Sequence, residues 1–299
     1  MRYRGRFAPS PSGPLHQGSL FAALVSWLDA RRAGGEWLLR FEDVDTERCQ
    51  PEFQNLIRQQ LRDFGLEWDA ELPAQSTRSD RYRSLVRQWW EQGRIYACAC
   101  TRRDLALFRR AGETCYPGIC RDKQLPMEGH ALRFRLPEDA QLSWTDRWQG
   151  PQQVNVAAQC GDPVLRRRTG DYSYQFAVTI DDAEQGITHV VRGCDLLPST
   201  GRQMLLLQAL GAPVPQYAHH PILLGSDGNK LSKSTGATGI RAHDAPTKLH
   251  SLWQAFGYAC PAELATAPVG EQLQWALEQP ETPFPAASGT LAPFVQCSS

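Results

Sequence analysis

The apolar positions near the start of the chain predict a strand, a helix and a second strand. Residues 3–7 form the first short strand, residues 19–32 an apolar helix that a glycine pair ends, and residues 36–41 the second strand. The loop between the first strand and the helix, residues 8–14, holds three prolines and one glycine. This order is typical of a parallel βαβ unit, so we expect a Rossmann-like, doubly wound parallel sheet.

Farther along, the α/β pattern is interrupted and then resumes. Apolar residues recur at helical spacing in residues 51–64, and residues 80–91 predict a further helix. In residues 125–169 the pattern changes to short strand-like pieces broken by proline and glycine, which indicates an insertion. A strand at residues 187–192 and a helix at residues 200–210 then restore the α/β order.

These elements predict four segments. They are the first half of a Rossmann-like catalytic domain (1–94), an insertion (95–186), the second half of the catalytic domain (187–240) and a short helical C-terminal region (241–299). From Pro280 onward the chain is rich in proline, alanine and serine, and we expect it to fray. The predicted fold class is therefore α/β, with one insertion.

The composition is that of a globular chain that can bury a large core. Its 299 residues include nine tryptophans, 41% are hydrophobic, and the mean hydropathy is −0.44. These values exclude disorder of the whole chain. The densest apolar run, residues 21–28, is far shorter than the roughly 20 residues of a membrane span. The first residues lack the apolar stretch of a signal peptide, so we expect a cytoplasmic protein.

The net charge says little about partners. Lysine plus arginine and aspartate plus glutamate number 32 each, and the formal charge is zero. A local basic face can still exist within a balanced total. The arginines at 102–103, 109–110 and 166–168 are candidate contacts to RNA phosphates, although most arginine runs are simply solvated.

Two loops carry residue types that bind phosphate. In the first, His-Gln-Gly-Ser at residues 16–19 opens a helix, where Gly18 lets a ligand approach the backbone and His16 can donate to a phosphoryl oxygen. In the second, Lys230 and Lys233 lie among hydroxyl residues and glycines, which suits a clamp on a triphosphate. Each loop alone has an ordinary alternative, a turn or a solvated loop. The pair at opposite ends of a βαβ frame indicates nucleotide binding.

The cysteines do not form a disulfide framework, because their number, nine, is odd and four of them cluster between Cys98 and Cys120. Such clustering favours a structural zinc site, one ion per chain, over disulfide bridges. Cys98, Cys100 and Cys120 offer three thiolates, and the spacing leaves the fourth ligand open between Cys115 and Tyr116. The alternative is a set of buried cysteines without metal.

Several motifs together resemble a known family. Residues 16–19 resemble the HIGH signature of class I aminoacyl-tRNA synthetases, and Lys-Leu-Ser-Lys-Ser at residues 230–234 resembles their KMSKS signature. Three further segments are similar to the glutamyl/glutaminyl branch: residues 6–13, 39–45 and 191–196. The similarity covers about residues 4 to 240. The fourth HIGH position differs, since Ser19 stands where the signature has histidine.

The resemblance implies a class I catalytic fold and a ligase that makes glutamyl-adenylate from ATP and L-glutamate, with Mg²⁺ accompanying ATP. Only residues 235–299 follow the KMSKS-like loop, so we expect no anticodon-binding domain. This length resembles a shortened member of the glutamyl branch, which activates glutamate without tRNA and attaches it to the queuosine base at the wobble position of tRNA(Asp). The expected partners are ATP, glutamate and the tRNA(Asp) anticodon region. We expect no membrane or protein partner, and a monomer.

Glutamate brings two carboxylates and one ammonium group, so its site needs fixed cations and at least one anion. Arg6 and Arg192 can supply bidentate forks, and Glu42, at the end of its strand, can receive the ammonium. The resemblance implies these glutamate contacts: Arg6, Phe7, Ala8, Pro9, Ser10, Glu42, Tyr174 and Arg192. Outside the family context, such arginine–glutamate pairs are ordinary surface salt bridges.

The resemblance also assigns catalytic, ATP-binding and metal residues. The catalytic residues are His16, Lys230 and Lys233. The ATP-binding residues are His16, Gly18, Ser19 and Lys233. The family's cysteine and tyrosine pattern falls on Cys98, Cys100, Tyr116 and Cys120, which favours Tyr116 over Cys115 as the fourth zinc ligand.

Three alternative functions stay open at this point. They are a small conventional glutamyl-tRNA synthetase, a small-molecule glutamate ligase and a non-catalytic RNA-binding paralogue. Transfer of labelled glutamate to tRNA separates a synthetase from a small-molecule ligase. Loss of His16 or of the loop lysines would mark the non-catalytic paralogue, and all of these residues are present.

Overall fold

The structure, a computed structural model, describes residues 2–110, 115–137, 139–223 and 240–280. The predicted lysine loop with Lys230 and Lys233 and most of the predicted frayed tail lie outside the described residues.

A parallel sheet organises the fold. It contains the strands β1 (Arg4–Phe7), β2 (Glu36–Leu39), β3 (Ala70–Glu71), β9 (His189–Gly193) and β10 (Gln216–His220). β2 pairs in parallel with β1 and β3, and β9 pairs in parallel with β10. The amide of Thr188 donates to Arg4 O over 2.9 Å, so β9 lies beside β1. The order across the sheet is β3-β2-β1-β9-β10. Chain order reverses between β1 and β9, which is the switch point of a doubly wound fold.

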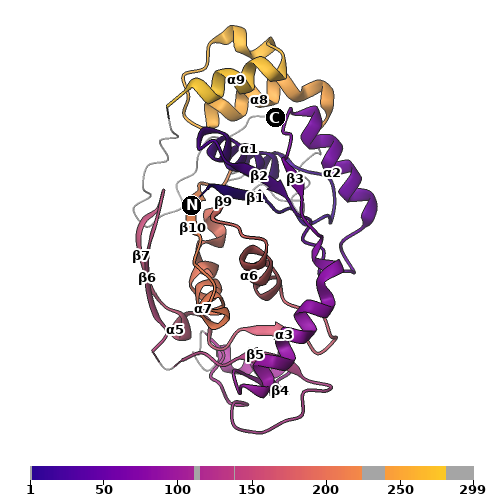
Figure 1. The fold of residues 1–299 in the computed structure, drawn as a ribbon, viewed down its shortest axis with the longest axis vertical. Helices are drawn as coiled ribbons and strands as arrows, with labels where there is room; N and C mark the ends of the chain where they lie inside the picture. Colours follow the sequence, from indigo (N-terminus) through magenta and orange to yellow (C-terminus); the bar gives the residue numbers. More distant parts are fainter. Residues whose placement is uncertain (1, 111–114, 138, 224–239, 281–299) are drawn as a thin grey trace.

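Helices cover both faces of this sheet. They are α1 (Gln17–Arg32), α6 (Tyr174–Glu184), α7 (Thr200–Leu210), α8 (Ala245–Ala255) and α9 (Val269–Glu278). Figure 1 shows α1, with α8 and α9 beyond it, on one side of the sheet and α6 and α7 on the other. α1 is buried around most of its circumference because it packs between the sheet and the C-terminal helices, where Phe21 and Phe256 lie in one core cluster.

The helices and strands predicted from periodicity are found, with small shifts at their ends. The helix predicted from residue 19 begins at Gln17, because His16 caps it. The helices at residues 51–64 and 80–91 are α2 (Pro51–Asp63) and α3 (Ser79–Glu91). The strand predicted to reach residue 41 ends at Leu39. Beyond it, the chain meets Pro9, which accepts from the Glu42 amide but has no N–H with which to continue the ladder.

The residues between α3 and α6 form a separate layer of short elements. One antiparallel sheet has the order β4-β5-β8, and β6 and β7 form a hairpin. These elements are β4 (Ile95–Cys98), α4 (Arg102–Arg110), β5 (Ala131–Phe134), β6 (Gln141–Asp146), β7 (Gly150–Asn155), α5 (Val156–Cys160) and β8 (Val164–Arg166). β4 and β5 lie at the opposite end of the molecule from α8 and α9, whereas the hairpin runs along one side (Figure 1). The Arg147 amide at the turn of the hairpin donates to Tyr217 O of β10 over 2.9 Å.

Short 3₁₀ turns complete the chain: η1 (Gln75–Arg78), η2 (Cys194–Ser199), η4 (Ala242–Asp244) and η5 (Ala262–Thr266). None of the helices in the described residues combines the length and the apolar character that crossing a bilayer requires.

Candidate active site

A cavity of about 480 Å³ opens at the carboxyl ends of β1 and β9, at the switch point of the sheet. Its walls come from the loop after β1, the first turn of α1, the end of β2, the start of α6 and the residues that follow β9. All the residues predicted to bind glutamate, and those predicted to bind ATP that the structure describes, line it: Arg6, Phe7, Ala8, Pro9, Ser10, His16, Gly18, Ser19, Glu42, Tyr174 and Arg192. Segments more than 180 residues apart in the chain therefore meet at one cavity.

A buried network of alternating charges forms the floor beneath Arg6. The Arg6 guanidinium donates twice to Asp182, over 3.0 and 2.9 Å. Arg40 lies 2.8 Å from the same carboxylate and also donates to Glu42 over 3.1 Å. Burial alone would raise the pKa of Asp182, but the two arginines outweigh burial and hold that pKa below its usual value.

Glu42 is the carboxylate of this network that lines the cavity. Burial raises its pKa to about 7, although the cations Arg40 and Arg6 oppose the shift. At neutral pH the group is therefore poised between its two protonation states. A ligand ammonium placed beside it would stabilise the charged state.

Arg192 reaches the cavity from the end of β9 and has only neutral partners. Its guanidinium donates to His219 Nε2 over 2.9 Å, to Gln203 Oε1 over 2.8 Å and to Thr200 Oγ1 over 2.9 Å. No carboxylate of the described residues forms an ion pair with it, although its residue is only 6% exposed. A buried cation whose partners are neutral favours an anionic ligand.

Tyr174 is the first residue of α6, and the preceding Ser173 caps this helix by accepting from the Phe176 amide. Among the described residues, none accepts a hydrogen bond from the Tyr174 hydroxyl. Burial, followed by the charge of Glu42, raises the pKa of Tyr174, so the hydroxyl stays neutral and can donate to a ligand.

His16 and Ser19 close the N-terminus of α1 as a capping box. His16 Nδ1 accepts from the Ser19 amide over 3.3 Å, and Ser19 Oγ accepts from the His16 amide over 2.8 Å. Because Nδ1 accepts, the proton of the neutral imidazole lies on Nε2. Ser19, which replaces the second histidine of the signature, is thus part of the helix cap.

The sequence analysis missed the residues that hold these groups in place. Arg40 and Asp182 are buried in the charge network, and Asp146 and His219 lie behind Arg192. One signal was available: two aspartates, Asp181 and Asp182, interrupt an otherwise apolar helix, and buried acids require partners.

A second cluster lies in the insertion, where three thiols approach one another. The Sγ atoms of Cys98, Cys100 and Cys120 all lie within 4.8 Å of one another, and those of Cys100 and Cys120 are 3.6 Å apart. Tyr116 Oη is 3.5 Å from Cys98 Sγ and 4.0 Å from Cys100 Sγ. Cys115 is not part of the group of thiols that meets this distance. Among the described residues, the fourth side chain at the cluster is therefore Tyr116.

The cluster is suited to a soft cation. Burial raises the pKa of Cys100 to about 12. At Cys120, hydrogen bonds from Tyr116, from the Ala99 backbone and from the other thiols outweigh burial and lower the pKa to about 7, so Cys120 is the thiol of this pair that ionises first. A thiolate is the form that binds metal. Three sulfur donors and one phenol oxygen, converging from a strand end and a following loop, fit the tetrahedral preference of Zn²⁺.

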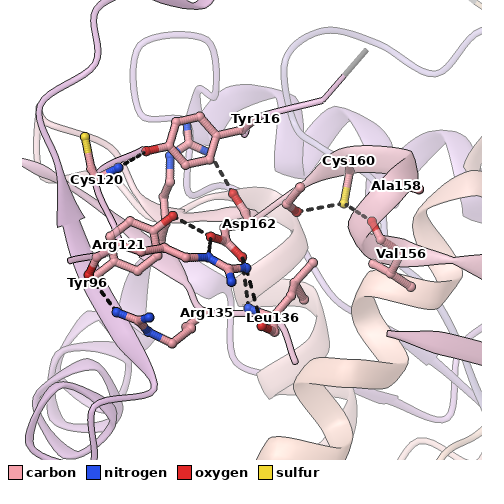
Figure 2. Close-up of polar contacts among 12 residues, drawn as sticks. Tyr96, Tyr116, Cys120, Arg121, Arg135, Leu136, Val156, Ala158, Cys160 and Asp162 are labelled. Atoms are coloured by element: carbon pink, nitrogen blue, oxygen red, sulfur yellow. Dashed lines mark hydrogen bonds and ion pairs between the residues drawn. The ribbon is translucent and has the colours of Figure 1, made fainter. Parts of the chain in front are cut away.

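Asp162 accepts hydrogen bonds from several residues that lie around the cluster. It accepts from Tyr96 Oη over 2.5 Å, from Arg121 over 2.6 and 2.5 Å, and from the Leu136 amide over 2.9 Å (Figure 2). Its backbone oxygen accepts from Arg133, whose guanidinium lies 3.7 Å from the centre of the Tyr116 ring. The network thus fixes the orientation of that ring.

Comparison with known proteins assigns the fold to a family. Residues 2–246 match the family model for the catalytic domain of class I tRNA synthetases (E and Q). The chain is 45% identical over 275 residues to a glutamyl-Q tRNA(Asp) synthetase of Pseudomonas syringae pv. tomato, with 92% of each chain covered. It is 47% identical over 276 residues to the protein of the same name from Thiobacillus denitrificans, with 91% of each chain covered.

Solved structures agree with the sequence comparison. The glutamate-tRNA synthetase of Elizabethkingia anophelis superimposes with a TM-score of 0.76 at 29% identity. The match covers 92% of this chain and 65% of that one, so the chain spans about two thirds of the solved enzyme. A glutamate tRNA ligase of Elizabethkingia meningosepticum, solved in complex with its amino acid, has the same TM-score and identity. The chain therefore belongs to the class I tRNA synthetases of the glutamate and glutamine branch, within the group of glutamyl-Q tRNA(Asp) synthetases, and is a ligase.

Proposed function

We propose that this ligase activates L-glutamate with ATP, without needing tRNA, and transfers the glutamyl group to the queuosine base at the wobble position of tRNA(Asp). The observation that carries the proposal is the charge pattern of the cavity. Arg6 and Arg192 complement two carboxylates, and Glu42 complements one ammonium. Relatives at 45 and 47% identity that bear the name glutamyl-Q tRNA(Asp) synthetase support the choice of acceptor.

In the first step, an oxygen of the glutamate α-carboxylate attacks the α-phosphorus of ATP. The new P–O bond gives the mixed anhydride, and the bond to the β-phosphate breaks with loss of pyrophosphate. His16, with its proton on Nε2, donates to a phosphate oxygen, and the positive end of α1 adds to the attraction. By the family resemblance, Lys230 and Lys233 neutralise the leaving phosphates, and Mg²⁺ accompanies ATP.

In the second step, a hydroxyl of the queuosine ring attacks the activated carbonyl. An ester bond forms, the bond to phosphate breaks, and AMP leaves with the electron pair. Arg192, Tyr174 and Glu42 hold the amino acid in place through both steps, so that the reaction proceeds within one bound complex.

We also propose that one Zn²⁺ binds to Cys98, Cys100, Tyr116 and Cys120. The support is the convergence of these four side chains and the bracing of Tyr116 through Asp162 and Arg133. The ion would be structural and would hold the loop between β4 and β5 on the insertion.

The test of the reaction has two stages. Exchange of pyrophosphate into ATP, measured with glutamate and without tRNA, reports on the activation step, and its absence would contradict the proposal. Labelled glutamate is then offered with tRNA(Asp) that contains queuosine but lacks only the 3′-terminal adenosine.

Shortened tRNA that still accepts glutamate would support transfer to the base. If removal of that one nucleotide abolishes transfer, the enzyme is a small conventional glutamyl-tRNA synthetase. Activation without transfer to full-length or shortened tRNA would indicate a small-molecule ligase. Failure of both activation and transfer would indicate a non-catalytic paralogue.

A further inference from the structure

A hydrogen-bonded chain of three buried side chains, Asp146, His219 and Arg192, ends at the cavity, and the proposed reaction uses only Arg192. Asp146 Oδ2 is 2.5 Å from His219 Nδ1, and His219 Nε2 accepts from Arg192 Nε over 2.9 Å. Asp146, His219 and Arg192 are 1%, 0% and 6% exposed. They come from three elements: the hairpin strand β6, the sheet strand β10 and the sheet strand β9. Only Arg192 lines the cavity.

The direction of the hydrogen bonds along this chain is determined at both ends. Arginine Nε always carries a proton, so His219 Nε2 must be the acceptor and the imidazole proton must lie on Nδ1. At the other end, Asp146 Oδ1 accepts from the amides of Trp148, Gln149 and His219 over 3.0 to 3.1 Å. The remaining oxygen, Oδ2, therefore faces the Nδ1 proton of His219.

We propose that Asp146 and His219 are positioning residues that set the imidazole tautomer required to hold the Arg192 guanidinium toward a substrate carboxylate. The inference rests on the proposed role of Arg192 in glutamate binding. It assigns a part in substrate recognition to the β6–β7 hairpin, which has no residue on the cavity wall.

The hairpin is anchored independently on both sides. Gln149 Nε2 donates to His219 O over 2.7 Å, and the Arg147 amide donates to Tyr217 O over 2.9 Å. The Arg147 guanidinium pairs with Asp29 of α1 over 2.7 and 2.8 Å. Asp146 is thereby held at a fixed distance from β10. Among the described residues, the Arg147 side chain contacts neither His219 nor Arg192, so Arg147 is a suitable control site.

The tautomer also links glutamate binding to pH. The groups that face His219 are Asp146 from β6, Arg192 from β9, Asp195 from η2, Thr200 from α7 and the neighbouring Tyr217. Burial, with help from Arg192, outweighs the two aspartates and lowers the pKa of His219. Protonation at acid pH would place an Nε2 proton against the Arg192 Nε proton and displace the guanidinium.

The sharpest test is Asp146→Asn, which is nearly isosteric. The three backbone amides keep the Asn oxygen at the Oδ1 position, so the NH₂ group faces His219 Nδ1 and forces the proton onto Nε2. We expect the KM for glutamate in pyrophosphate exchange to rise roughly 10–100-fold, with the KM for ATP unchanged within about twofold. Arg147→Gln, the matched control, should leave both values within about twofold.

His219→Gln separates geometry from titration. Its amide oxygen can still accept from Arg192 but does not ionise, so we expect a smaller increase in the glutamate KM. We expect wild type to show a further decrease in kcat/KM below the pKa of His219, and His219→Gln should lose this decrease while it keeps the one that Glu42 causes near pH 7. Equal glutamate KM values for wild type and Asp146→Asn would overturn the proposal. An equal increase in Arg147→Gln would also overturn it, because the effect would then come from the anchoring of the hairpin.

A measurement without catalysis distinguishes this proposal from the proposed function. The ¹⁵N resonances of labelled histidine in the wild-type enzyme at pH 7 should show His219 neutral and protonated on Nδ1. A proton on Nε2, or a charged ring, would contradict the tautomer assignment whatever the substrate is. Failure of wild type to exchange pyrophosphate with glutamate would instead contradict the proposed function.

Discussion

Arg6 and Arg192 are both buried at the cavity, yet they have different electrostatic surroundings. Arg6 is paired with Asp182, whose charge it shares with Arg40, so much of its charge is already balanced within the protein. Arg192 donates only to uncharged acceptors of the described residues. A ligand carboxylate therefore gains more from Arg192 than from Arg6.

Replacement of Arg192 should affect one substrate selectively. We expect Arg192→Lys, which keeps the charge but loses the planar fork, to raise the KM for glutamate roughly tenfold, and Arg192→Ala to raise it more. The KM for ATP should hardly change, because the guanidinium is proposed to contact a carboxylate of glutamate and not a phosphate. Steady-state pyrophosphate exchange with each substrate varied in turn measures both values; equal weakening for both substrates would argue against the assignment.

Glu42 should make glutamate binding depend on pH near neutrality. Its pKa is raised from 4.5 to about 7 by burial, so the free enzyme binds a proton there that a substrate ammonium must displace. Glutamate affinity should therefore rise as the pH rises through about 7. The stability of the free protein should change in the opposite direction. It should fall as the pH rises from about 4.5 to about 7, because in this range the folded state holds the proton and the unfolded chain does not.

Glutamate titrations at several pH values, by calorimetry or protection against unfolding, measure this effect. Glu42→Gln cannot ionise and should show weaker binding with little pH dependence near 7. A wild-type affinity that stays constant from pH 6 to 8 would show that the ammonium does not contact Glu42.

At the scale of single elements, the residues at the start of α1 stabilise the helix end, and they are also the residues that we propose to bind phosphate. Ser19 contributes to the cap through its side chain, and His16 contributes through Nδ1. Ser19→Ala should lower the free energy of unfolding by about 1 kcal/mol, the usual value of a lost cap. Urea unfolding measures the change, and Ser84→Ala, at an exposed position of α3 that does not line the cavity, is the control.

If Ser19 also binds ATP, the KM for ATP should rise in Ser19→Ala beyond the change in Ser84→Ala. An unchanged KM would restrict Ser19 to the helix cap. His16→Gln, in contrast, should slow activation much more than it weakens glutamate binding, since its donor acts on charge that develops at phosphorus.

In the loop between β4 and β5, Tyr116 lies at the three thiols and is the fourth zinc ligand that we propose. Tyr116 lies within 4.0 Å of two of the three thiols, and Cys115 does not belong to the thiol group. We expect about one zinc per chain in wild type and in Cys115→Ser, and a roughly 10–100-fold weaker zinc affinity in Tyr116→Phe. Competition with a chromophoric chelator measures the affinity. If Cys115→Ser binds zinc more weakly than Tyr116→Phe does, Cys115 and not Tyr116 is the fourth ligand.

At the scale of the whole molecule, the two candidate sites belong to different cores. One large cluster joins the parallel sheet to α1, α8 and α9, whereas Tyr96, Cys98, Tyr116 and Cys120 form a small cluster of their own. The strand β4, which carries Cys98, lies at one end of the long axis, and β1 and β9, whose carboxyl ends border the cavity, lie nearer its other end (Figure 1). The small cluster can therefore lose its order while the residues around the cavity keep theirs.

Removal of the zinc by a chelator should therefore open the insertion and spare activation. Limited proteolysis should cut between β4 and β5 after chelation, and tRNA-independent pyrophosphate exchange should stay within about twofold. Re-addition of zinc should restore protease resistance. A parallel loss of exchange and resistance would mean that the two cores are coupled.

The periodic elements could be predicted because their signals are local. The helices α2, α3 and α7 follow from apolar spacing, glycine stops and a capping position, within one or two residues. The C-terminal end of β2 was less predictable than its start at Glu36, since it depends on the partner strand, where Pro9 ends the ladder. The predicted cavity residues could be named in advance from motifs, and the structure brings those it describes to one cavity.

The amino-acid sequence alone determined the βαβ start, the family and the residues of the candidate sites, because these depend on short motifs and on the period of apolar positions. Only the tertiary structure decided which of two adjacent residues joins the thiols. It decided that Arg6 shares a buried carboxylate with Arg40, whereas Arg192 donates only to neutral acceptors among the described residues. It also decided that Asp146, on a hairpin of the insertion, reaches a histidine 73 positions later. Such contacts depend on the packing of distant segments, and no local pattern in the chain encodes that packing.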